Sequence, residues 1–455
     1  MSLLKKPSLL LILFAFCFSA VFMDMFREWH LKQNNFKFDS ANYYSYLPAY
    51  FYNKGNFQFN KEIDGYLIID KDGKKITKAT YGVSFLNIPF FLLAHKIAIN
   101  QGSPRDGFSE PYSTCIHWSG IFYGLLGLFF LRQFLIKHFS EIVTTTVLAL
   151  IFFGSTVFAY TYTFSEMSHV YLFMLFSAVL ALTNTFYEKP TTWRFAILGL
   201  LFGLISLIRL VDSIILMVFF FWSVSNLDEA KKRVLFYLTN PRTLIIVVVF
   251  FIIWIPQMLF WKQHMGAYLH YSYPGEKFFW GDPQLINILF SYRKGWLLYS
   301  PLMIFAFVGM FFMKSQHGKN RYTLIIIMLT VIYIYSCWWD WFFGGCFGGR
   351  PFVAYHAMLA LPLAAFVKWL FSNTLKKYLL GVKFLLIGCL FYCLCLNIGQ
   401  TQQYANGLIH YNGMTKKAYW HMFGKYVIFG SDSNTYWESL KEPNYPDLLE
   451  GKRDQ

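Results

Sequence analysis

Long apolar stretches recur along this chain, and they restrict its fold more than any other sequence feature. A helix needs about 20 mostly apolar residues to cross the hydrocarbon core of a bilayer. Stretches near this length occupy residues 7–26, 112–131, 142–160, 167–187, 194–210, 212–226, 242–262, 296–313, 322–338, 352–372 and 379–397. Of the 455 residues, 56% are hydrophobic and 14% are charged, which excludes a soluble globular domain. The sequence therefore predicts an all-α polytopic membrane protein with about eleven transmembrane helices.

The basic residues indicate how these helices cross the membrane. The net charge is +16, but Lys and Arg concentrate in short gaps between apolar stretches, which is typical of topology signals rather than nucleic-acid binding. With a cytoplasmic N-terminus, every short basic cluster falls on the cytoplasmic side, as the positive-inside rule expects. This agreement requires that the apolar stretch Val83–Ile99 does not cross. Because it carries Asn87 and Pro89, we predict that it forms a helix lying in the outer membrane interface.

The domain organisation follows from this topology. We expect one membrane domain at 1–397, whose first outer loop spans 27–111, and an outward-facing C-terminal tail at 398–455. Within the outer loop, residues 65–69 and 75–77 flank the turn sequence Asp70-Lys71-Asp72-Gly73, which predicts a small β-hairpin. The two turn aspartates are therefore not interpreted as the metal-binding pair of a nucleotide-sugar enzyme.

One acid stands out in the first outer loop, shortly after the first apolar stretch ends. Asp39 lies near the start of the tyrosine-rich run Phe38–Ala49, in which Tyr43 and Tyr44 follow it. A carboxylate held just outside the bilayer, in a protein otherwise built of membrane helices, suggests chemistry on a lipid-borne substrate. We take Asp39 as the candidate catalytic residue and the two tyrosines as candidate substrate contacts.

Four cations depart from the positive-inside pattern. Arg293, Lys294 and Arg350 begin apolar stretches on the predicted outer side, and Arg209 lies within the membrane near the same leaflet. An ionisable group at a helix centre costs about 2.5–3.5 kcal/mol and commonly marks a site or a pair. These cations would bind the phosphate of a lipid-linked substrate, Arg by bidentate hydrogen bonds. Alternatively, Arg209 pairs with Asp212 and the other three extend to the lipid headgroups.

Two further outer segments carry candidate substrate-binding residues. Glu166 and His169 lie near the start of a predicted helix, three residues apart, and are expected to share a face toward the site. Stabilisation by the helix dipole would explain Glu166 equally well. Trp339 and Asp340 lie in an aromatic outer loop, where an indole would stack on a sugar ring and a carboxylate would accept a sugar hydroxyl. Interfacial tryptophans are also ordinary in membrane proteins.

With these features in place, the chain resembles the GT-C glycosyltransferases, the polytopic family that includes protein O-mannosyltransferases and lipid A aminoarabinose transferases. The likeness covers roughly residues 1–400. It is most specific in Asp39 with Tyr43-Tyr44 and Leu47-Pro48-Ala49, in Tyr81-Gly82-Val83-Ser84 before Pro89-Phe90-Phe91, in the hairpin around Arg209, and in Lys294–Pro301 with Gly349-Arg350-Pro351. The last pair looks like an uncharacterised bacterial branch.

The resemblance implies a function and a location. It implies inverting transfer of a sugar from a polyprenyl-phosphate donor to a hydroxyl of a glycan, lipid or protein acceptor, with Asp39 as general base. The expected location is a bacterial inner membrane with the active site on the periplasmic side. The family often has a second acid, for which Asp64 and Glu62 are candidates, and a divalent metal stays open as a cofactor. The competing function is a transporter or flippase of lipid-linked glycans, which would use the same cations and aromatic side chains without a base.

Overall fold

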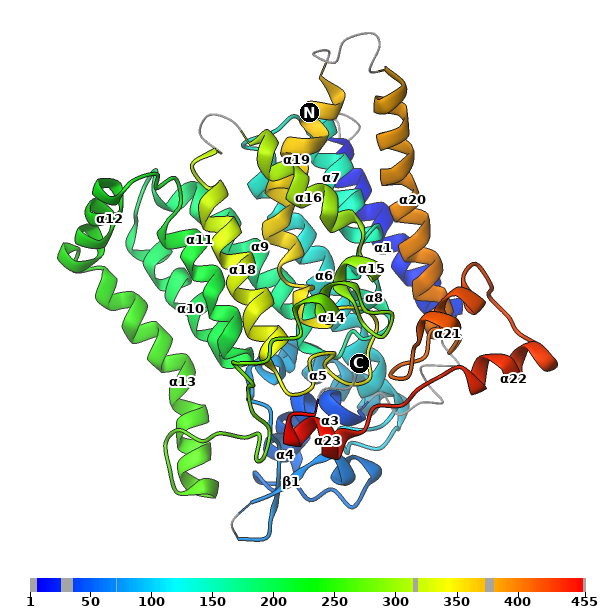
Figure 1. Cartoon of the computed structure of the whole chain (residues 1–455). Helices are drawn as coiled ribbons and strands as arrows, with labels where there is room; N and C mark the ends of the chain where they lie inside the picture. Colours follow the sequence, from blue (N-terminus) through cyan, green and yellow to red (C-terminus); the bar gives the residue numbers. More distant parts are fainter. Residues whose placement is uncertain (1–5, 26–35, 71, 314–317, 373–379, 453–455) are drawn as a thin grey trace.

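The structure, a computed structural model, describes residues 6–25, 36–70, 72–313, 318–372 and 380–452 (Figure 1). Residues 26–35 of the predicted outer loop lie outside this range, as do several basic residues of the predicted topology signals, namely Lys5, Lys314, Lys376 and Lys377. The described part of the chain is mostly helical. It therefore agrees with an all-α membrane protein.

The elements of the first half surround the predicted outer loop. They are α1 (Pro7–Met25), α3 (Phe38–Tyr44), α4 (Tyr46–Tyr52), η2 (Glu62–Tyr66), β1 (Ile68–Ile69), β2 (Lys75–Ile76), α5 (Gly82–Gln101), α6 (Glu110–Leu135), α7 (Glu141–Phe153), α8 (Val157–Tyr162), α9 (Ser168–Phe186), α10 (Thr192–Ile208), η3 (Leu210–Ile215) and α11 (Leu216–Phe220). The second half contains helices joined by loops, with one isolated β-bridge between Phe278 and Trp338 in its described part. Its elements are α12 (Leu227–Thr239), α13 (Thr243–Met265), α14 (Leu285–Phe290), α15 (Trp296–Tyr299), α16 (Leu302–Gly309), η4 (Met310–Phe312), α18 (Arg321–Cys337), η5 (Arg350–Phe352), α19 (His356–Phe371), α20 (Leu380–Ala405), α21 (Lys416–Met422), α22 (Ser431–Glu438) and α23 (Tyr445–Glu450).

Every predicted apolar stretch contains helix, although not always one continuous helix. Five helices of the described chain are long and apolar enough to cross a membrane: α5, α6, α9, α13 and α20. The predicted helix at 142–160 is interrupted between α7 and α8, and the one at 296–313 between α15 and α16. Pro301 lies at the second break, where its missing N–H and fixed φ favour the start of a new helix.

The apolar helices form a bundle whose ends lie at the top and bottom of Figure 1. In the most hydrophobic segment of α9, 83% of the residues are buried, whereas in α13 and α20 only 17% are. Since α13 and α20 are strongly apolar, their exposed surfaces fit contact with lipid chains. The centre of the bundle is occupied by α9 and by α19, whose residues from His356 to Val367 are all buried.

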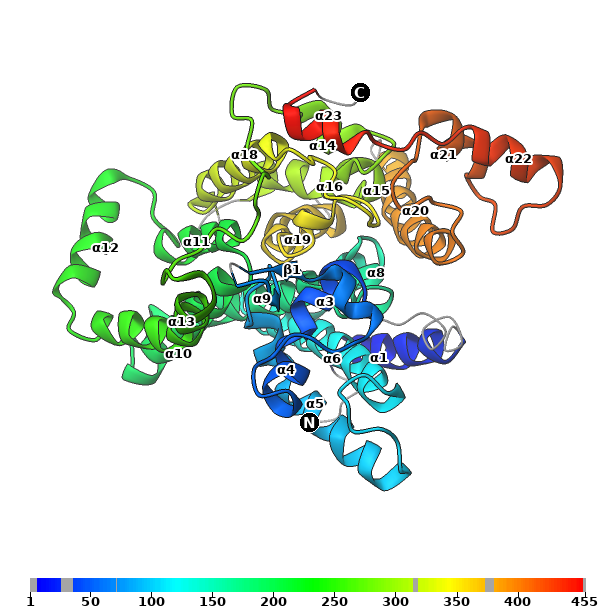
Figure 2. The same ribbon diagram turned by 90° about the horizontal axis from the view of Figure 1, so that it is seen from below.

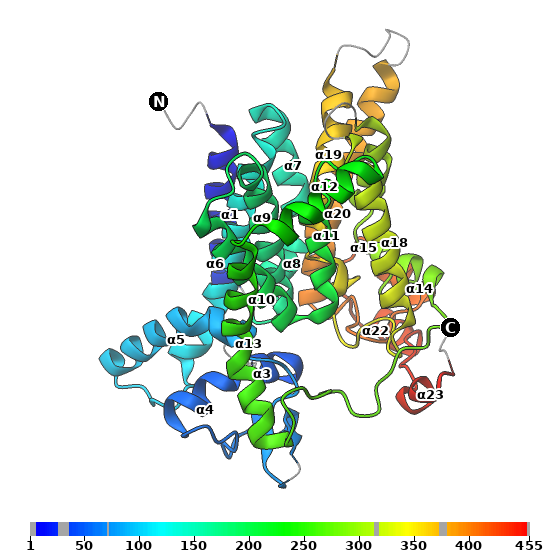
Figure 3. The same cartoon turned by 90° about the vertical axis from the view of Figure 1, so that its left-hand side faces the viewer.

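The described elements of the first outer loop gather below the bundle (Figure 1). The predicted hairpin is confirmed, because β1 and β2 pair antiparallel with Ile68 opposite Ile76. Asp70 stabilises its turn by accepting the N–H groups of Asp72 and Lys74, and its other oxygen lies 3.1 Å from His264 Nδ1. α5, over the stretch predicted to be interfacial, lies across the bundle axis (Figure 3).

The last long helix ends later than predicted. α20 continues to Ala405, so the C-terminal tail begins there rather than at 398. Gln400, Thr401 and Gln403 end the apolar pattern, but they are buried, and both glutamines hydrogen-bond to α21 residues. Polar residues with partners on a packed neighbour extend a helix beyond the point where hydropathy marks its end.

Candidate functional site

Asp39 lies in the first turn of α3 and pairs with a residue far away in the sequence. Its Oδ2 is 2.9 Å from Nη1 of Arg350 in η5. The Asp39 side chain is 31% exposed and that of Arg350 is 16% exposed, so the pair is accessible at its carboxylate side. The pair joins the first outer loop to the loop before α19, at the lower end of the bundle (Figure 2). The structure therefore brings the predicted catalytic acid directly to one of the predicted phosphate-binding cations.

Asn42 holds α3 in the position that this ion pair requires. Its Nδ2 donates to the carbonyls of Phe38, 3.1 Å away, and Tyr66, 3.0 Å away. Its Oδ1 accepts the N–H of Lys78 at 2.9 Å. Asn42 is 3% exposed and so ties α3 to η2 and to the segment after the hairpin. A single Asn in a loop has no distinguishing pattern, so nothing in the sequence marks Asn42 as part of the site.

The loop that carries Arg350 approaches α15 closely through two glycines. Gly348 has a φ of +59°, a conformation that favours glycine, and a Cβ on Gly349 would lie 2.7 Å from the Cβ of Trp296. The Trp296 ring stacks on Phe352 with centroids 4.2 Å apart. The two motifs that the sequence analysis paired, Lys294–Pro301 and Gly349-Arg350-Pro351, thus pack against each other.

Arg209 is the second cation of the site. It ends α10, with Nη1 3.6 Å from Asp212 Oδ2, and its Nη2 donates to Ser168 Oγ at 3.4 Å and to His169 Nδ1 at 3.3 Å. Because arginine only donates, His169 Nδ1 is unprotonated in this contact. Arg209 thus pairs with Asp212, as the alternative interpretation of the sequence expects. Arg209 nevertheless also lies close enough to Asp39 to act on it electrostatically.

Asp212 itself is a fully buried anchor for this arginine. It accepts hydroxyl hydrogen bonds from Tyr335, at 2.5 Å, and from Tyr355, at 2.9 Å. Both hydroxyls donate to Oδ1, whereas Oδ2 has no hydrogen-bond partner among the described residues and is balanced by the charge of Arg209, 3.6 Å away. These two tyrosines fix Asp212, and through it they orient Arg209.

Lys294 and Arg293 approach the same region from the start of α15. Lys294 is 2% exposed and donates from Nζ to the carbonyl of Cys346. Burial, together with repulsion by Arg350 and Arg293, lowers the pKa of Lys294 to about 8, although Cys346 and Asp340 oppose this shift. Arg293 donates from Nη1 to the carbonyl of Asn412 at 3.2 Å, and its guanidinium lies 4.9 Å from the Phe342 ring centroid. The C-terminal tail therefore contacts this side of the site.

Asp340 is a second carboxyl group near the cations. It is 7% exposed, and its Oδ1 has no hydrogen-bond partner among the described residues. Burial, with a contribution from Glu276, raises the pKa of Asp340 to about 7 against the opposing effect of Arg350 and Arg293.

The pKa of Asp39 shifts in the opposite direction. Burial alone would raise it, but Arg350, assisted by Lys78 and Arg209, holds it below its ordinary value.

Together these groups form what we call the Asp39 cluster. It comprises Asp39, Tyr43, Lys78, His169, Arg209, Glu276, Arg293, Lys294, Asp340 and Arg350. Tyr43 belongs to it because its phenol lies near enough to Arg350 and Arg209 to interact electrostatically. With Asp340 neutral, cations outnumber carboxylates in the cluster. It is therefore suited to bind an anion.

Three of the predicted substrate-binding residues, Tyr44, Glu166 and Trp339, contact groups other than Asp39 and Arg350. The Tyr44 ring stacks on Phe36 with centroids 3.7 Å apart, and its hydroxyl donates to the Gly107 carbonyl. Glu166 lies 3.2 Å from His117 Nδ1, so it faces α6, whereas His169 faces Arg209. Glu166 precedes α9 rather than lying within it, which explains why the two do not share a helix face. Trp339 donates from Nε1 to Glu276 Oε2 at 2.8 Å, so it contacts the cluster at Glu276 rather than at Asp39 or Arg350.

The candidates for a second acid also have structural partners. Asp64 accepts the N–H groups of Phe59 and Asn60, and Lys75 lies 3.4 Å away. Glu62 lies 3.3 Å from Lys37 Nζ. Asp340, from a distant loop, is instead the second carboxyl group near Arg350. Within the described residues, no group of three or more His, Cys, Asp and Glu side chains is arranged to hold a metal ion.

Comparison with known proteins gave no family assignment. No protein-family model matches the chain, and no curated protein matches it. The chemistry of the site therefore has to be argued from its own residues. They comprise a paired, ionised carboxylate, a carboxyl group that titrates near neutrality, and several fixed cations at one end of an apolar bundle.

Labelling with a hydrophobic carbodiimide, which couples to protonated carboxyl groups, should distinguish the two aspartates. Asp340 is mostly neutral below its pKa of about 7 and ionised above it. Its labelling should therefore fall roughly tenfold from pH 6 to pH 8, as expected for a group centred at pH 7. Asp39 should stay unlabelled at both pH values, since its pKa is lowered. Peptide mass spectrometry reads both sites, with Asp340→Asn as control. Equal labelling of Asp39 and Asp340 at pH 6 would contradict the assignment.

Proposed function

We propose that this protein is a GT-C-type membrane glycosyltransferase that transfers a sugar from a polyprenyl-phosphate donor to an acceptor hydroxyl with inversion. The observation that carries the proposal is the ion pair between Asp39 and Arg350, set beside Arg209 at one end of an apolar bundle. An acid that can act as a base thus lies next to cations that can bind a phosphate. A lipid-linked donor bound here would place its phosphate beside the two arginines and its anomeric carbon near Asp39.

The proposed topology places the cluster outside the cytoplasm. We infer a cytoplasmic N-terminus, about eleven crossings and, in a bacterial inner membrane, a periplasmic Asp39 cluster. The distribution of basic residues supports this orientation. Lys231, Lys232 and Arg233 of α12 lie near the upper end of the bundle, where α1 begins, whereas α3 lies below the lower end (Figure 3).

Thiol labelling tests this orientation. Lys54 follows α4 at the Asp39 end and is exposed, and Lys231 of α12 is exposed near the other end. In intact cells, a membrane-impermeant maleimide should label Lys54→Cys, and should label Lys231→Cys only after permeabilisation. The unsubstituted chain measures the background from its native free cysteines. Labelling of both variants in intact cells, or the reverse pattern, would contradict the topology.

Arg350 and Arg209 would bind the phosphate of the donor. A guanidinium has five N–H donors, and the contact of Arg350 with Asp39 through Nη1 leaves others for phosphate oxygens. Arg209 is oriented by Asp212, and Lys294 adds a charge that its buried position keeps fixed. As the bond between the anomeric carbon and phosphate oxygen breaks, the electron pair stays on the polyprenyl phosphate. Preorganised cations stabilise that charge without reorganising at the moment of reaction.

Asp39 would act as the general base. It would accept the proton of the acceptor hydroxyl while that oxygen forms the new bond to the anomeric carbon from the face opposite the phosphate. In the unliganded protein the lowered pKa keeps Asp39 ionised but makes it a weak base. A bound phosphate would compete for the charge of Arg350, and the basicity of Asp39 would then rise. Donor binding would thereby make Asp39 a stronger base. Proton transfer to Asp39 would be slow before the donor binds.

A transfer assay tests the function directly. Detergent-solubilised protein would receive radiolabelled polyprenyl-phosphate sugar, together with membranes from a strain lacking the gene as a source of acceptor. Asp39→Asn should reduce product formation by about 10²–10⁴-fold, the usual contribution of a positioned base. Asp72→Asn, an equivalent change at the exposed hairpin turn, should leave the rate unchanged. Transfer by Asp39→Asn at the wild-type rate would exclude Asp39 as the base. Lipid movement across liposomes without any glycosidic product would favour a flippase.

The affinity for donor should depend on the ionisation of Asp340. Asp340 is neutral below its pKa of about 7 and charged above it, and a charged Asp340 would repel the phosphate and compete for Arg350. The phosphodiester keeps the same charge throughout. The KM for donor should therefore rise up to about fourfold from pH 6 to pH 7.5, a range below the pKa of about 8 of Lys294. Asp340→Asn should keep the low-pH KM throughout. An equal rise in both enzymes would contradict this role.

A further inference from the structure

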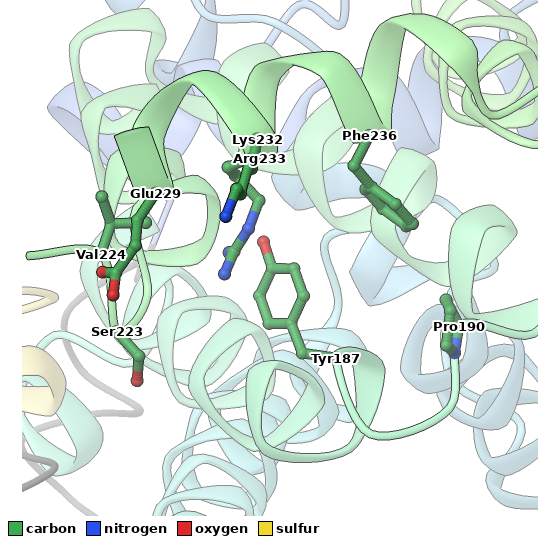
Figure 4. Close-up of a pocket in the computed structure, with 8 residues that line it drawn as sticks. All are labelled: Tyr187, Pro190, Ser223, Val224, Glu229, Lys232, Arg233 and Phe236. Carbon is green, nitrogen blue, oxygen red and sulfur yellow. The ribbon is translucent and has the colours of Figure 1, made fainter. Parts of the chain in front are cut away.

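A pocket lies beneath α12, near the end of the bundle opposite the Asp39 cluster. Its volume is about 360 Å³. α12 forms one wall with Glu229, Lys232, Arg233 and Phe236, and Tyr187 after α9 forms the floor (Figure 4). The nitrogen atoms of Lys232 and Arg233 both point toward the space above Tyr187 in this view. Nothing in the proposed transfer reaction uses this pocket.

Arg233 is a fixed positive charge in the pocket. Its guanidinium lies 3.8 Å from the Tyr187 ring centroid, and Nη1 and Nη2 donate to the carbonyls of Phe220 and Trp222, each at 3.1 Å. These contacts fix the orientation of the guanidinium but leave its charge without a carboxylate counterion in the described chain. An arginine held in this way is preorganised to interact with an anion.

Lys232 is the free cation of the pocket. It makes no ion pair or hydrogen bond with any described residue, and its side chain is exposed. The nearby carboxylate of Glu229 does not neutralise it, because Glu229 already binds Lys319 Nζ at 3.1 Å and the N–H and hydroxyl of Ser225 at 2.7 and 2.9 Å. The pocket therefore has a net positive charge.

The opposite side of α12 is exposed and mostly apolar, with Lys231 as a charged residue on it. Leu227 and Leu238 are each 79% exposed, Leu235 is 58% exposed and Val234 is 51% exposed. α12 runs across the bundle axis near its upper end (Figure 3). A helix with apolar side chains along one side and basic residues on the other, oriented in this way, is typical of an in-plane helix at the boundary between headgroups and acyl chains.

We propose that this pocket binds the headgroup of an anionic phospholipid, with its phosphate between Lys232 and Arg233, while the leucines on the other side of α12 hold the helix at the membrane surface. Apolar walls from Phe236 and Pro190 suit the glycerol and upper acyl region. The exposed leucines favour a lipid over a soluble phosphate, because they would be buried only in a membrane. The inference rests on α12 alone and is independent of the proposed transfer reaction.

Native mass spectrometry of the full chain tests the proposal with two matched variants. Purified protein in detergent would be offered dioleoyl phosphatidylglycerol or dioleoyl phosphatidylcholine, and retained lipid counted. Wild type should retain phosphatidylglycerol selectively. Lys232→Gln should weaken its retention about fivefold, the usual contribution of one lysine to anionic lipid binding. Lys231→Gln removes the same charge from the neighbouring position outside the pocket lining and should change retention less than about twofold. Lys232→Arg should retain the lipid, which controls for misfolding.

Three results would overturn the proposal. Equal retention of the two lipids would show that the site does not select anionic headgroups. Equal weakening by Lys232→Gln and Lys231→Gln would show diffuse surface attraction rather than a pocket. Displacement of the lipid by an equal concentration of glycerophosphoglycerol would show that the site recognises a soluble phosphodiester and that the leucine side of α12 is not involved.

Discussion

The contact between Asp39 and Arg350 is the interaction on which the rest of the site depends, because it joins the first outer loop to the loop before α19. Burial disfavours both charges, but their mutual attraction outweighs this desolvation, so that Asp39 and Arg350 both stay ionised. Its position is set from both sides. Asn42 fixes α3 through hydrogen bonds with Tyr66, Thr77 and Lys78. Gly348 and Gly349 allow the Arg350 loop to lie against Trp296.

This geometry gives two aspartates within reach of the same arginine opposite ionisation behaviour. Asp39 touches Arg350, and its pKa is lowered. Asp340 is more deeply buried and has an oxygen without a partner, and its pKa is raised to about 7. Two titratable groups whose environments move their pKa values apart are a common arrangement in sites that handle protons near neutral pH. A ligand that takes up the charge of Arg350 would change both groups, raising the pKa of Asp39 and further favouring neutral Asp340.

Hydropathy located the helices well, because the apolar pattern of each stretch is also what a buried or lipid-facing helix requires. It failed where buried polar residues have hydrogen-bond partners inside the fold, as at Gln400 and Gln403, which prolong α20.

The site was only partly predictable. Charges placed against the topology rule identified Arg209 and Arg350, since such charges need partners. Tyr44 was misleading, because adjacent residues of a short helix point in different directions, and Tyr44 packs in a separate apolar cluster. Asn42 and Glu276 depend on contacts between distant loops, which no local pattern reveals.

The two ends of the bundle hold positive charge in different ways, and the difference lies in whether each cation has a carboxylate partner. Near the lower end, Arg350 and Arg209 each have a carboxylate partner within 4 Å, so their positions are specified by the fold. Near the upper end, Lys232 has no such partner, so nothing in the described protein offsets its charge or restricts its ammonium group. A cation without a counterion in the chain is stabilised by whatever anion the surroundings supply. On the proposal that the leucines hold α12 at a membrane surface, that anion would be a lipid phosphate, and Lys232 would then bind the chain to one leaflet.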